Sequence, residues 1–319
     1  MAKSTVSSSS HVVDAIPSGS RVKTKQIQSL RPSKRLKQPM RLPSAWRISG
    51  RAYHLIWRYR RLFTAITIVY GLLNLLLVQG LANHNDITTI KQELSQVFNG
   101  QFSSLASGLA GFVLLVGSAG NGSSNTAGAY QFFLLLLTSL ALIWALRQTS
   151  AGTLVRMRDA YYRSMYPLVP FMLVLLVIGL ELLPMLIGTS LYSIIISNGI
   201  AITGIEKLAW AGLAILLSLV SVYLISSSIF ALYIVTLPDM TPLKALRSAR
   251  QLVKLRRWVV ARKLLFLPVL LLAAAAIIMV PIIIWLTALS QWVFFILTML
   301  ALVAVHAYLY CLYRELLNE

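Results

Sequence analysis

The sequence predicts an all-α integral membrane protein, a polytopic helical bundle of about six transmembrane helices with amphipathic helices on the cytoplasmic side. Three observations predict this class. Hydrophobic residues make up 57% of the 319 residues and charged residues only 12%, whereas about a quarter of a soluble domain is charged. The apolar residues form uncharged runs close to the roughly 20 residues that a bilayer-spanning helix needs. Lys and Arg, 29 against 9 Asp and Glu, gather between these runs. This pattern excludes a soluble globular protein.

The first 43 residues are expected to form a disordered basic tail. Residues 1–43 are rich in Ser, Lys, Arg, Gln and Pro and contain no Phe, Tyr or Trp, so they cannot bury enough apolar surface to offset chain entropy. No apolar core of a secretory signal occurs in them, although their acid-poor, Ser- and Arg-rich composition also matches an organellar transit peptide. We expect a cytoplasmic tail near anionic lipid, with an organellar membrane as the alternative.

A short amphipathic helix is predicted directly before the first span. Between Trp46 and Arg61, the apolar residues Ile48, Ala52 and Leu55 recur at helical spacing with arginines interleaved. We expect an elbow helix that lies in the membrane interface.

Six apolar runs predict the transmembrane helices of one membrane domain, residues 44–319. The expected spans are residues 62–81, 130–146, 167–187, 208–237, 264–289 and 292–313. A seventh apolar stretch, residues 105–118, is shorter and contains three glycines. We expect it on the outer side of the membrane, as an interfacial or re-entrant element that packs against protein to satisfy its backbone.

The distribution of cations predicts the orientation. With six spans and a cytoplasmic N-terminus, 27 Lys and Arg lie on the cytoplasmic side and only Lys91 and Lys207 lie outside. This is the asymmetry that the positive-inside rule describes. A seventh span would move either the basic loop at 147–163 or the tail to the other side. The sequence therefore predicts a multi-pass protein of a cell (inner) membrane with both termini in the cytoplasm.

The segment between the fourth and fifth spans predicts a second amphipathic helix. Thr241 followed by Pro242 is typical of a helix start. The apolar stripe downstream consists of Ala245, Leu246, Ala249, Leu252, Val253 and Val260. The basic stripe consists of Lys244, Arg247, Arg250, Lys254 and Arg257. Such a helix either lies along the inner leaflet with its cations on lipid phosphates, or packs against the bundle and is basic only because of its topology.

The same segment resembles a known family. The resemblance is carried by Leu237 to Ser248, Leu252 to Lys254 and Arg256 to Trp258. These residues are similar to a signature before the fifth span of six-span bacterial membrane proteins related to the membrane domain beside some glycerophosphodiester phosphodiesterases. Leu255 stands where that family usually has Gly. The resemblance implies a polytopic inner-membrane protein whose biochemical role is poorly defined.

Three polar residues are expected at membrane depth, where such groups are costly and often functional. They are Asn74, Glu181 and His306. Glu181 is expected to face the bundle interior and to hydrogen-bond Asn74 or a serine of the fourth span such as Ser218 or Ser221. It either serves a proton or cation path or only ties helices together. His306 is expected to join helices through a hydrogen bond rather than to bind a ligand.

No motif in the sequence points to an enzyme. The nine acidic residues are dispersed, one cysteine is present, and no phosphate-loop, nucleophile-elbow or zinc motif occurs. We expect no catalytic residue, no metal and no cofactor. The expected function is that of a non-enzymatic envelope-organising or accessory subunit that contacts anionic lipids and partner membrane proteins but no nucleic acid. The alternative is a small transporter or channel for a solute or lipid with Glu181 near the path.

Overall fold

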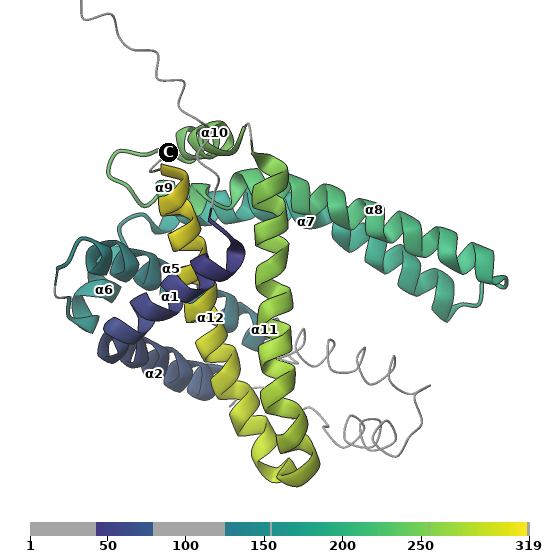
Figure 1. Ribbon diagram of the computed structural model, residues 1–319, viewed down its shortest axis with the longest axis horizontal. Helices are drawn as coiled ribbons and strands as arrows, with labels where there is room; N and C mark the ends of the chain where they lie inside the picture. The colour runs from purple at the N-terminus through teal and green to yellow at the C-terminus, as the bar shows by residue number, and fades with distance from the viewer. Residues whose placement is uncertain (1–42, 79–124, 154, 255, 318–319) are drawn as a thin grey trace, which may run out of the picture. The chain divides into compact units, whose positions relative to one another are not determined.

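The computed structural model describes residues 43–78, 125–153, 155–254 and 256–317. All regular secondary structure in these ranges is α-helical (Figure 1), which confirms the predicted all-α class. The helices are α1 (Ala45–Arg58), α2 (Arg60–Leu77), α5 (Asn125–Ser150), α6 (Met157–Ser164), α7 (Leu168–Ser197), α8 (Gly204–Ser228), α9 (Ala231–Ile234), α10 (Pro242–Val253), α11 (Arg257–Trp285) and α12 (Thr287–Leu317).

Six stretches within the described helices are long and apolar enough to cross a membrane. They are Arg60–Leu77, Gly128–Ser150, Leu168–Ser197, Gly204–Ile234, Arg257–Trp285 and Leu289–Leu317. Each overlaps one of the six runs expected from the sequence. The expected element at 105–118 and residues 1–42 of the expected tail lie outside the described residues.

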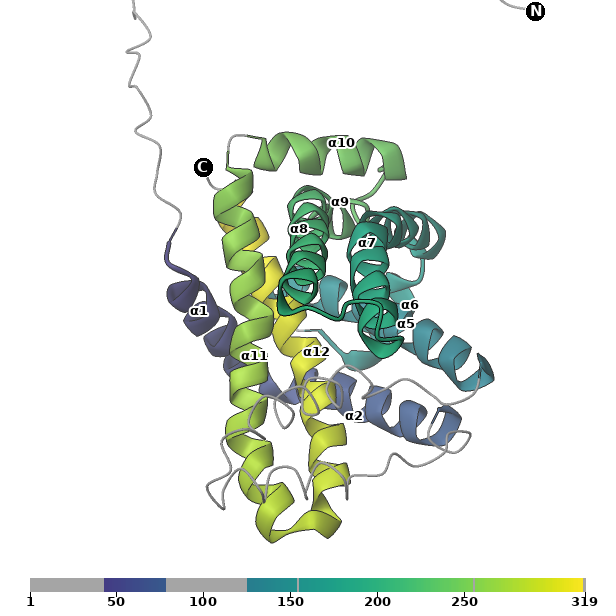
Figure 2. The same ribbon diagram turned by 90° about the vertical axis from the view of Figure 1, so that its right-hand side faces the viewer.

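α7 and α8 form an antiparallel hairpin with a well-defined turn (Figures 1 and 2). α7 continues to Ser197, beyond the expected end of its span, and Gly199 with φ of 65° ends it. The amide of Ile200 donates to Ile195 O at 3.1 Å, which satisfies a carbonyl of the last turn. α8 then starts at a capping box, in which Thr203 and Glu206 each bond the other's backbone amide.

The hairpin's two helices approach closely at one point. A Cβ on Gly188 would lie 3.1 Å from Leu217 Cβ and 3.3 Å from Ala214 Cα. The amide of Met185 also donates to Ser221 Oγ at 3.0 Å. Many apolar side chains on the outer sides of both helices are exposed. Such a surface is unfavourable in water, and it fits helices that contact lipid.

The expected elbow appears as α1, which ends at Arg58 and is joined to α2 through Tyr59. The start of α1 is fastened to α11, because Lys263 Nζ donates to Pro43 O at 2.6 Å. α1 also contacts α12, where Arg51 pairs with Glu315. Segments far apart in the sequence are thus joined at α1.

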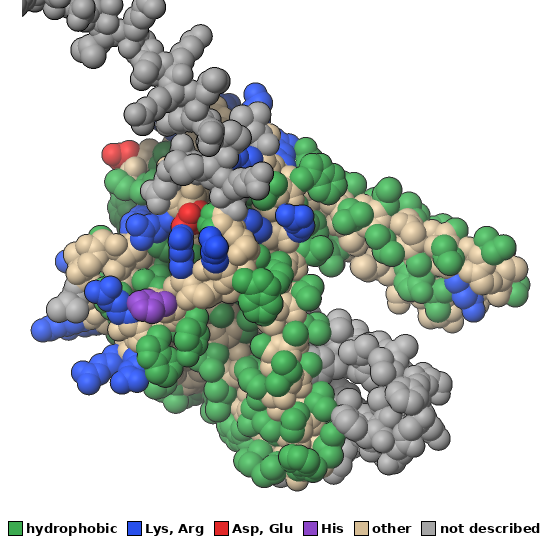
Figure 3. All heavy atoms as spheres, viewed as in Figure 1, with side chains coloured by type: hydrophobic (Ala, Val, Ile, Leu, Met, Phe, Trp, Pro, Cys, Tyr) green, Lys and Arg blue, Asp and Glu red, His purple; other side chains and the backbone are tan. Residues whose placement is uncertain are grey.

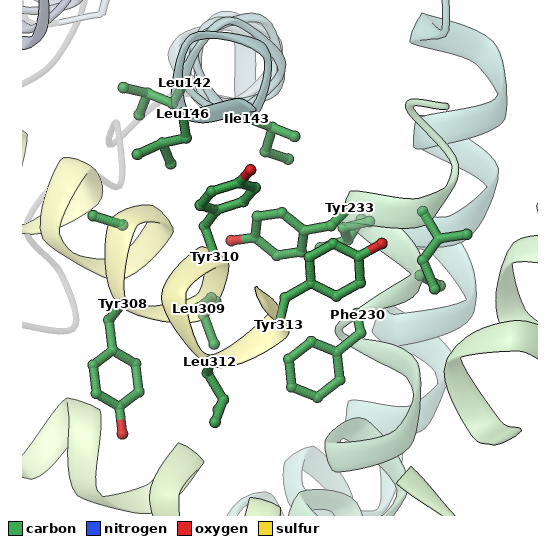
Figure 4. Packing of buried hydrophobic residues seen from close by; sticks show 14 of the residues in the cluster. Leu142, Ile143, Leu146, Phe230, Tyr233, Tyr308, Leu309, Tyr310, Leu312 and Tyr313 are labelled. Carbon is green, nitrogen blue, oxygen red and sulfur yellow. The ribbon is translucent and has the colours of Figure 1, made fainter. Parts of the chain in front are cut away.

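The core is densest around α5, α9 and the second half of α12. The rings of Phe230, Tyr233, Tyr310 and Tyr313 lie together beside α5, while Tyr308 points away from them (Figure 4). Tyr308 donates its hydroxyl to Lys263 O at 3.0 Å. The aromatic residues near the end of α12 therefore contact α5 on one side and α11 on the other (Figure 4).

Candidate functional site

α10 has one buried face and one charged face. The Thr241 hydroxyl caps its start by accepting a hydrogen bond from Lys244 N at 3.4 Å, and Pro242 occupies the first helical turn. The buried residues of the helix are Ala245, Leu246, Ala249 and Val253. The helix contacts α7, α8, α9 and α12, and Figure 2 shows it lying across the ends of α8, α9 and α7. The helix is thus seated on the core through its apolar stripe.

The other face of α10 is basic. Its exposed cations are Lys244, Arg247, Arg250 and Lys254. Within the described ranges, Arg250 is the one of these four that pairs with a carboxylate. Three cations on this face therefore have no acidic neighbour there to neutralise them.

Glu181 lies where α7, α8 and α10 meet. Its Oε1 accepts a hydrogen bond from Ser228 Oγ at 2.6 Å and lies 3.8 Å from Arg250 Nη2. The Glu181 residue is 9% exposed, whereas the Arg250 side chain is 55% exposed. Its second oxygen, Oε2, is buried without a hydrogen-bond partner among the described residues. This arrangement can hold α10 against the hairpin, and it leaves one carboxylate oxygen free to accept a proton or a cation.

The partner of Glu181 is a serine of the fourth span, as expected, but it is Ser228 rather than Ser218 or Ser221. The antiparallel register of the hairpin explains the position. Gly188 faces Leu217 and Met185 reaches Ser221. Moving toward the N-terminus of α7 therefore moves toward the C-terminus of α8, so Glu181 meets Ser228 rather than Ser218 or Ser221. Three consecutive serines close α8, and this run was the available sequence signal.

Asn74 does not contact Glu181 through a hydrogen bond either. It is 2% exposed on α2. Its amide nitrogen Nδ2 and Glu181 Oε2 both lack partners in the part of the chain that the structure describes. Asn74 and Glu181 therefore do not form one polar site.

Arg257 does not belong to the basic face of α10, contrary to the expectation. α10 ends at Val253, and Arg257 begins α11. Its guanidinium lies 5.5 Å from the centroid of the Tyr223 ring, and Nη1 donates to the Tyr223 hydroxyl at 3.3 Å. The change of helix direction after Val253 breaks the stripe that one continuous helix would have produced.

His306 joins three helices. Its Nε2 lies 3.0 Å from Ser139 Oγ on α5, and its Nδ1 lies 3.3 Å from the Tyr233 hydroxyl on α9. All three side chains are buried. The network matches the expected role of a hydrogen-bonding residue between helices.

From the sequence, Arg147 was counted only as a cation that sets the topology. In the structure its side chain hydrogen-bonds the chain around the end of α9. Its guanidinium donates to Tyr233 O at 3.0 Å and to Thr236 O at 2.9 Å, and it also reaches the Thr236 hydroxyl. It therefore binds the end of α5 to the end of α9. A basic residue at a helix end gave no sequence signal for these specific partners.

No constellation for metal binding is found among the described residues, where no three His, Cys, Asp or Glu side chains gather. Among the polar groups that the structure brings together are the Glu181–Ser228–Arg250 cluster, the His306 network and the contacts of Arg147. No family model matches this sequence, and no curated protein or solved structure matches it either.

Proposed function

We propose that this chain is a non-enzymatic, multi-pass protein of a cell (inner) membrane that binds anionic phospholipid headgroups through α10 and acts as an envelope-organising or accessory subunit. The observation that carries the proposal is the two-faced character of α10. Its apolar face is buried against the core, while Lys244, Arg247 and Lys254 are exposed without a carboxylate partner among the described residues. Each such cation contributes about 1 kcal/mol near an anionic membrane surface.

The proposed orientation places both termini and α10 in the cytoplasm. The 27 to 2 division of Lys and Arg supports it. Contacts between segments assigned to the same side agree with this division: Ser150 meets Tyr310 at 2.7 Å, and Arg51 meets Glu315.

The test is lipid selectivity of the purified full-length protein. Native mass spectrometry in micelles containing equal phosphatidylglycerol and phosphatidylcholine should show preferential retention of the anionic lipid. The variant Lys244→Gln/Arg247→Gln/Lys254→Gln should reduce that preference at least tenfold. The charge-conserving variant Lys244→Arg/Arg247→Lys/Lys254→Arg should retain it. An unchanged preference in the Gln variant would refute binding through α10.

A second candidate function is transport, favoured by the buried and unpartnered Oε2 of Glu181. A carboxyl at such a site can take up and release a proton or cation. In this case the protein in sealed vesicles would conduct protons, detected with an enclosed pH dye under a potassium diffusion potential. Glu181→Gln would abolish the flux, and Ser228→Ala would only alter it. Absence of flux with the natural protein would remove this candidate.

A further inference from the structure

A cavity of about 670 Å³ lies between α1 and the C-terminal ends of α5 and α12. This volume falls within the range of sites for small molecules and headgroups, about 300–1,000 Å³. Its walls come from segments that are far apart in the sequence, and the pairing of Arg51 with Glu315 helps to hold them together. The cavity is separate from α10, none of whose residues lines it.

The lining is strongly basic. Four arginines, Arg47, Arg51, Arg58 and Arg314, line the cavity together with one acidic residue, Glu315. Arg51 already pairs with this carboxylate. Figure 3 shows Lys and Arg side chains gathered on the face that carries α1 and the end of α12. The cavity therefore holds more positive charge than its own carboxylate can balance.

Three of the guanidiniums lack an acidic partner within the described ranges. Arg47 and Arg314 make no ion pair there, and Arg58 lies 5.8 Å from the centroid of the Tyr59 ring without meeting a carboxylate. Like charges around one cavity repel each other, and an anion between them removes this repulsion.

Hydroxyl groups complete the wall. Ser150 Oγ and the Tyr310 hydroxyl lie 2.7 Å apart at the cavity, and one of the two can turn a proton toward a ligand oxygen. The planar donor fork of arginine matches the tetrahedral oxygens of phosphate, which it binds through two parallel hydrogen bonds. A basic pocket among the ends of membrane helices is a known form of headgroup site.

We infer that this cavity is a binding site for a phosphate group, carried either by a lipid headgroup or by a soluble phosphate compound. Arg47 and Arg314 are the principal ligands, because both are exposed and unpaired among the described residues. Arg51 stays with Glu315 and shapes the site. The inference depends on the cavity alone and not on lipid binding by α10.

A second cavity extends the basic region. It measures about 410 Å³, shares Arg58 and Tyr59 with the first, and is also lined by Arg60 and Arg61. A ligand with more than one phosphate could thus meet cations on both sides of the turn between α1 and α2.

The test uses the full chain in detergent with two probes, phosphatidic acid and inorganic phosphate. Native mass spectrometry should detect one saturable phosphatidic acid per chain, with phosphatidylcholine as the neutral reference. The variant Arg47→Gln/Arg314→Gln should weaken this binding at least tenfold. Arg158→Gln/Arg163→Gln, which removes two exposed arginines of α6 and has the same net charge, should leave it unchanged.

The arms of the test distinguish the sources of the phosphate. If excess inorganic phosphate fails to displace bound phosphatidic acid, the natural ligand is a lipid headgroup. If inorganic phosphate binds alone and displaces the lipid, the natural ligand is a soluble phosphate compound. The variant Arg47→Lys/Arg314→Lys, which keeps the charge but loses the donor fork, should show an intermediate loss. No binding of either probe, or an equal loss in the α6 variant, overturns the inference. If only the Lys244→Gln/Arg247→Gln/Lys254→Gln variant of α10 loses phosphatidic acid, the lipid binds at α10. That result would support the proposed function and contradict binding in this cavity.

Discussion

Arg250 on α10 and Glu181 on α7 form an ion pair, with Nη2 and Oε1 3.8 Å apart, in which the carboxylate is buried and the guanidinium is largely exposed. The same Oε1 accepts the hydroxyl of Ser228 at 2.6 Å. One carboxylate oxygen therefore connects the amphipathic helix with both helices of the α7–α8 hairpin. The pair gives α10 a polar attachment in addition to its buried apolar stripe.

Replacing Arg250 with Gln should destabilise the protein more than replacing Lys254 with Gln. The first change leaves the buried Glu181 carboxylate without its cation, while the second removes an exposed charge. We expect a loss of about 1–2 kcal/mol in the free energy of unfolding. This is less than the cost of breaking a fully buried pair, because about half of the Arg250 side chain is exposed to solvent. Thermal unfolding in detergent, followed by tryptophan fluorescence, measures it. Adding Glu181→Gln to the Arg250 variant should recover part of the loss, and identical melting temperatures of the Arg250 and Lys254 variants would contradict the prediction.

Replacing His306 with Ala should lower stability by about 1–3 kcal/mol, because it removes the ring that bonds the buried hydroxyls of Ser139 and Tyr233. The Tyr233 hydroxyl keeps its second acceptor, the backbone oxygen of residue 306 at 3.3 Å, so the loss falls mainly on Ser139. Tyr233→Phe removes one hydroxyl but keeps the ring, whose centroid lies 5.8 Å from that of Tyr313. It should therefore cost less than the His306 change. The same thermal assay compares the two variants, and a larger effect of Tyr233→Phe would mean that His306 is not the centre of this network.

The close approach of α7 and α8 gives a matched pair of glycine variants. Gly188→Leu should separate the hairpin helices, since even a Cβ at this position would lie 3.1 Å from Leu217. Overpacking of this kind costs about 1–3 kcal/mol. Gly179→Leu, on the same helix with nothing within 4 Å of its Cβ position, should be neutral or stabilising because Leu is the better helix former. Equal melting temperatures of the two variants would refute the described contact.

The long helices and the start of α10 could be predicted from the sequence because they depend on local properties. Apolar run length decides whether a helix can cross a bilayer, and Thr241 with Pro242 marks a helix start within three residues. The end of α10 was harder to predict from the sequence. In the sequence the basic stripe continues to Arg257, but the chain turns after Val253. The spacing of the apolar residues does not indicate that turn.

Pairing between helices could not be predicted, because it depends on register and tertiary packing. The partner of Glu181 is set by where Gly188 lets α7 approach Leu217, and a depth count from the sequence does not contain that contact. Arg51 and Glu315 are separated by 264 positions, so neither residue indicates the other. Lys263 was counted only as one cation of a basic loop, yet it is 5% exposed and bonded to Pro43.

The orientation itself can be tested with single cysteines introduced into a Cys311→Ser background. Arg156 and Lys254 are exposed, and each is separated from the exposed Lys207 by one candidate span. Arg156→Cys and Lys254→Cys should react with a membrane-impermeant maleimide from the same side, and Lys207→Cys from the opposite side, because the positive-inside rule keeps the two basic segments together. Sealed vesicles of both orientations provide the measurement, and detergent-opened vesicles show the maximum labelling of each site. If Lys207→Cys reacts from the same side as Arg156→Cys, α7 does not cross the membrane. The six-span topology, and with it the placement of α10 at the inner leaflet, would then be wrong.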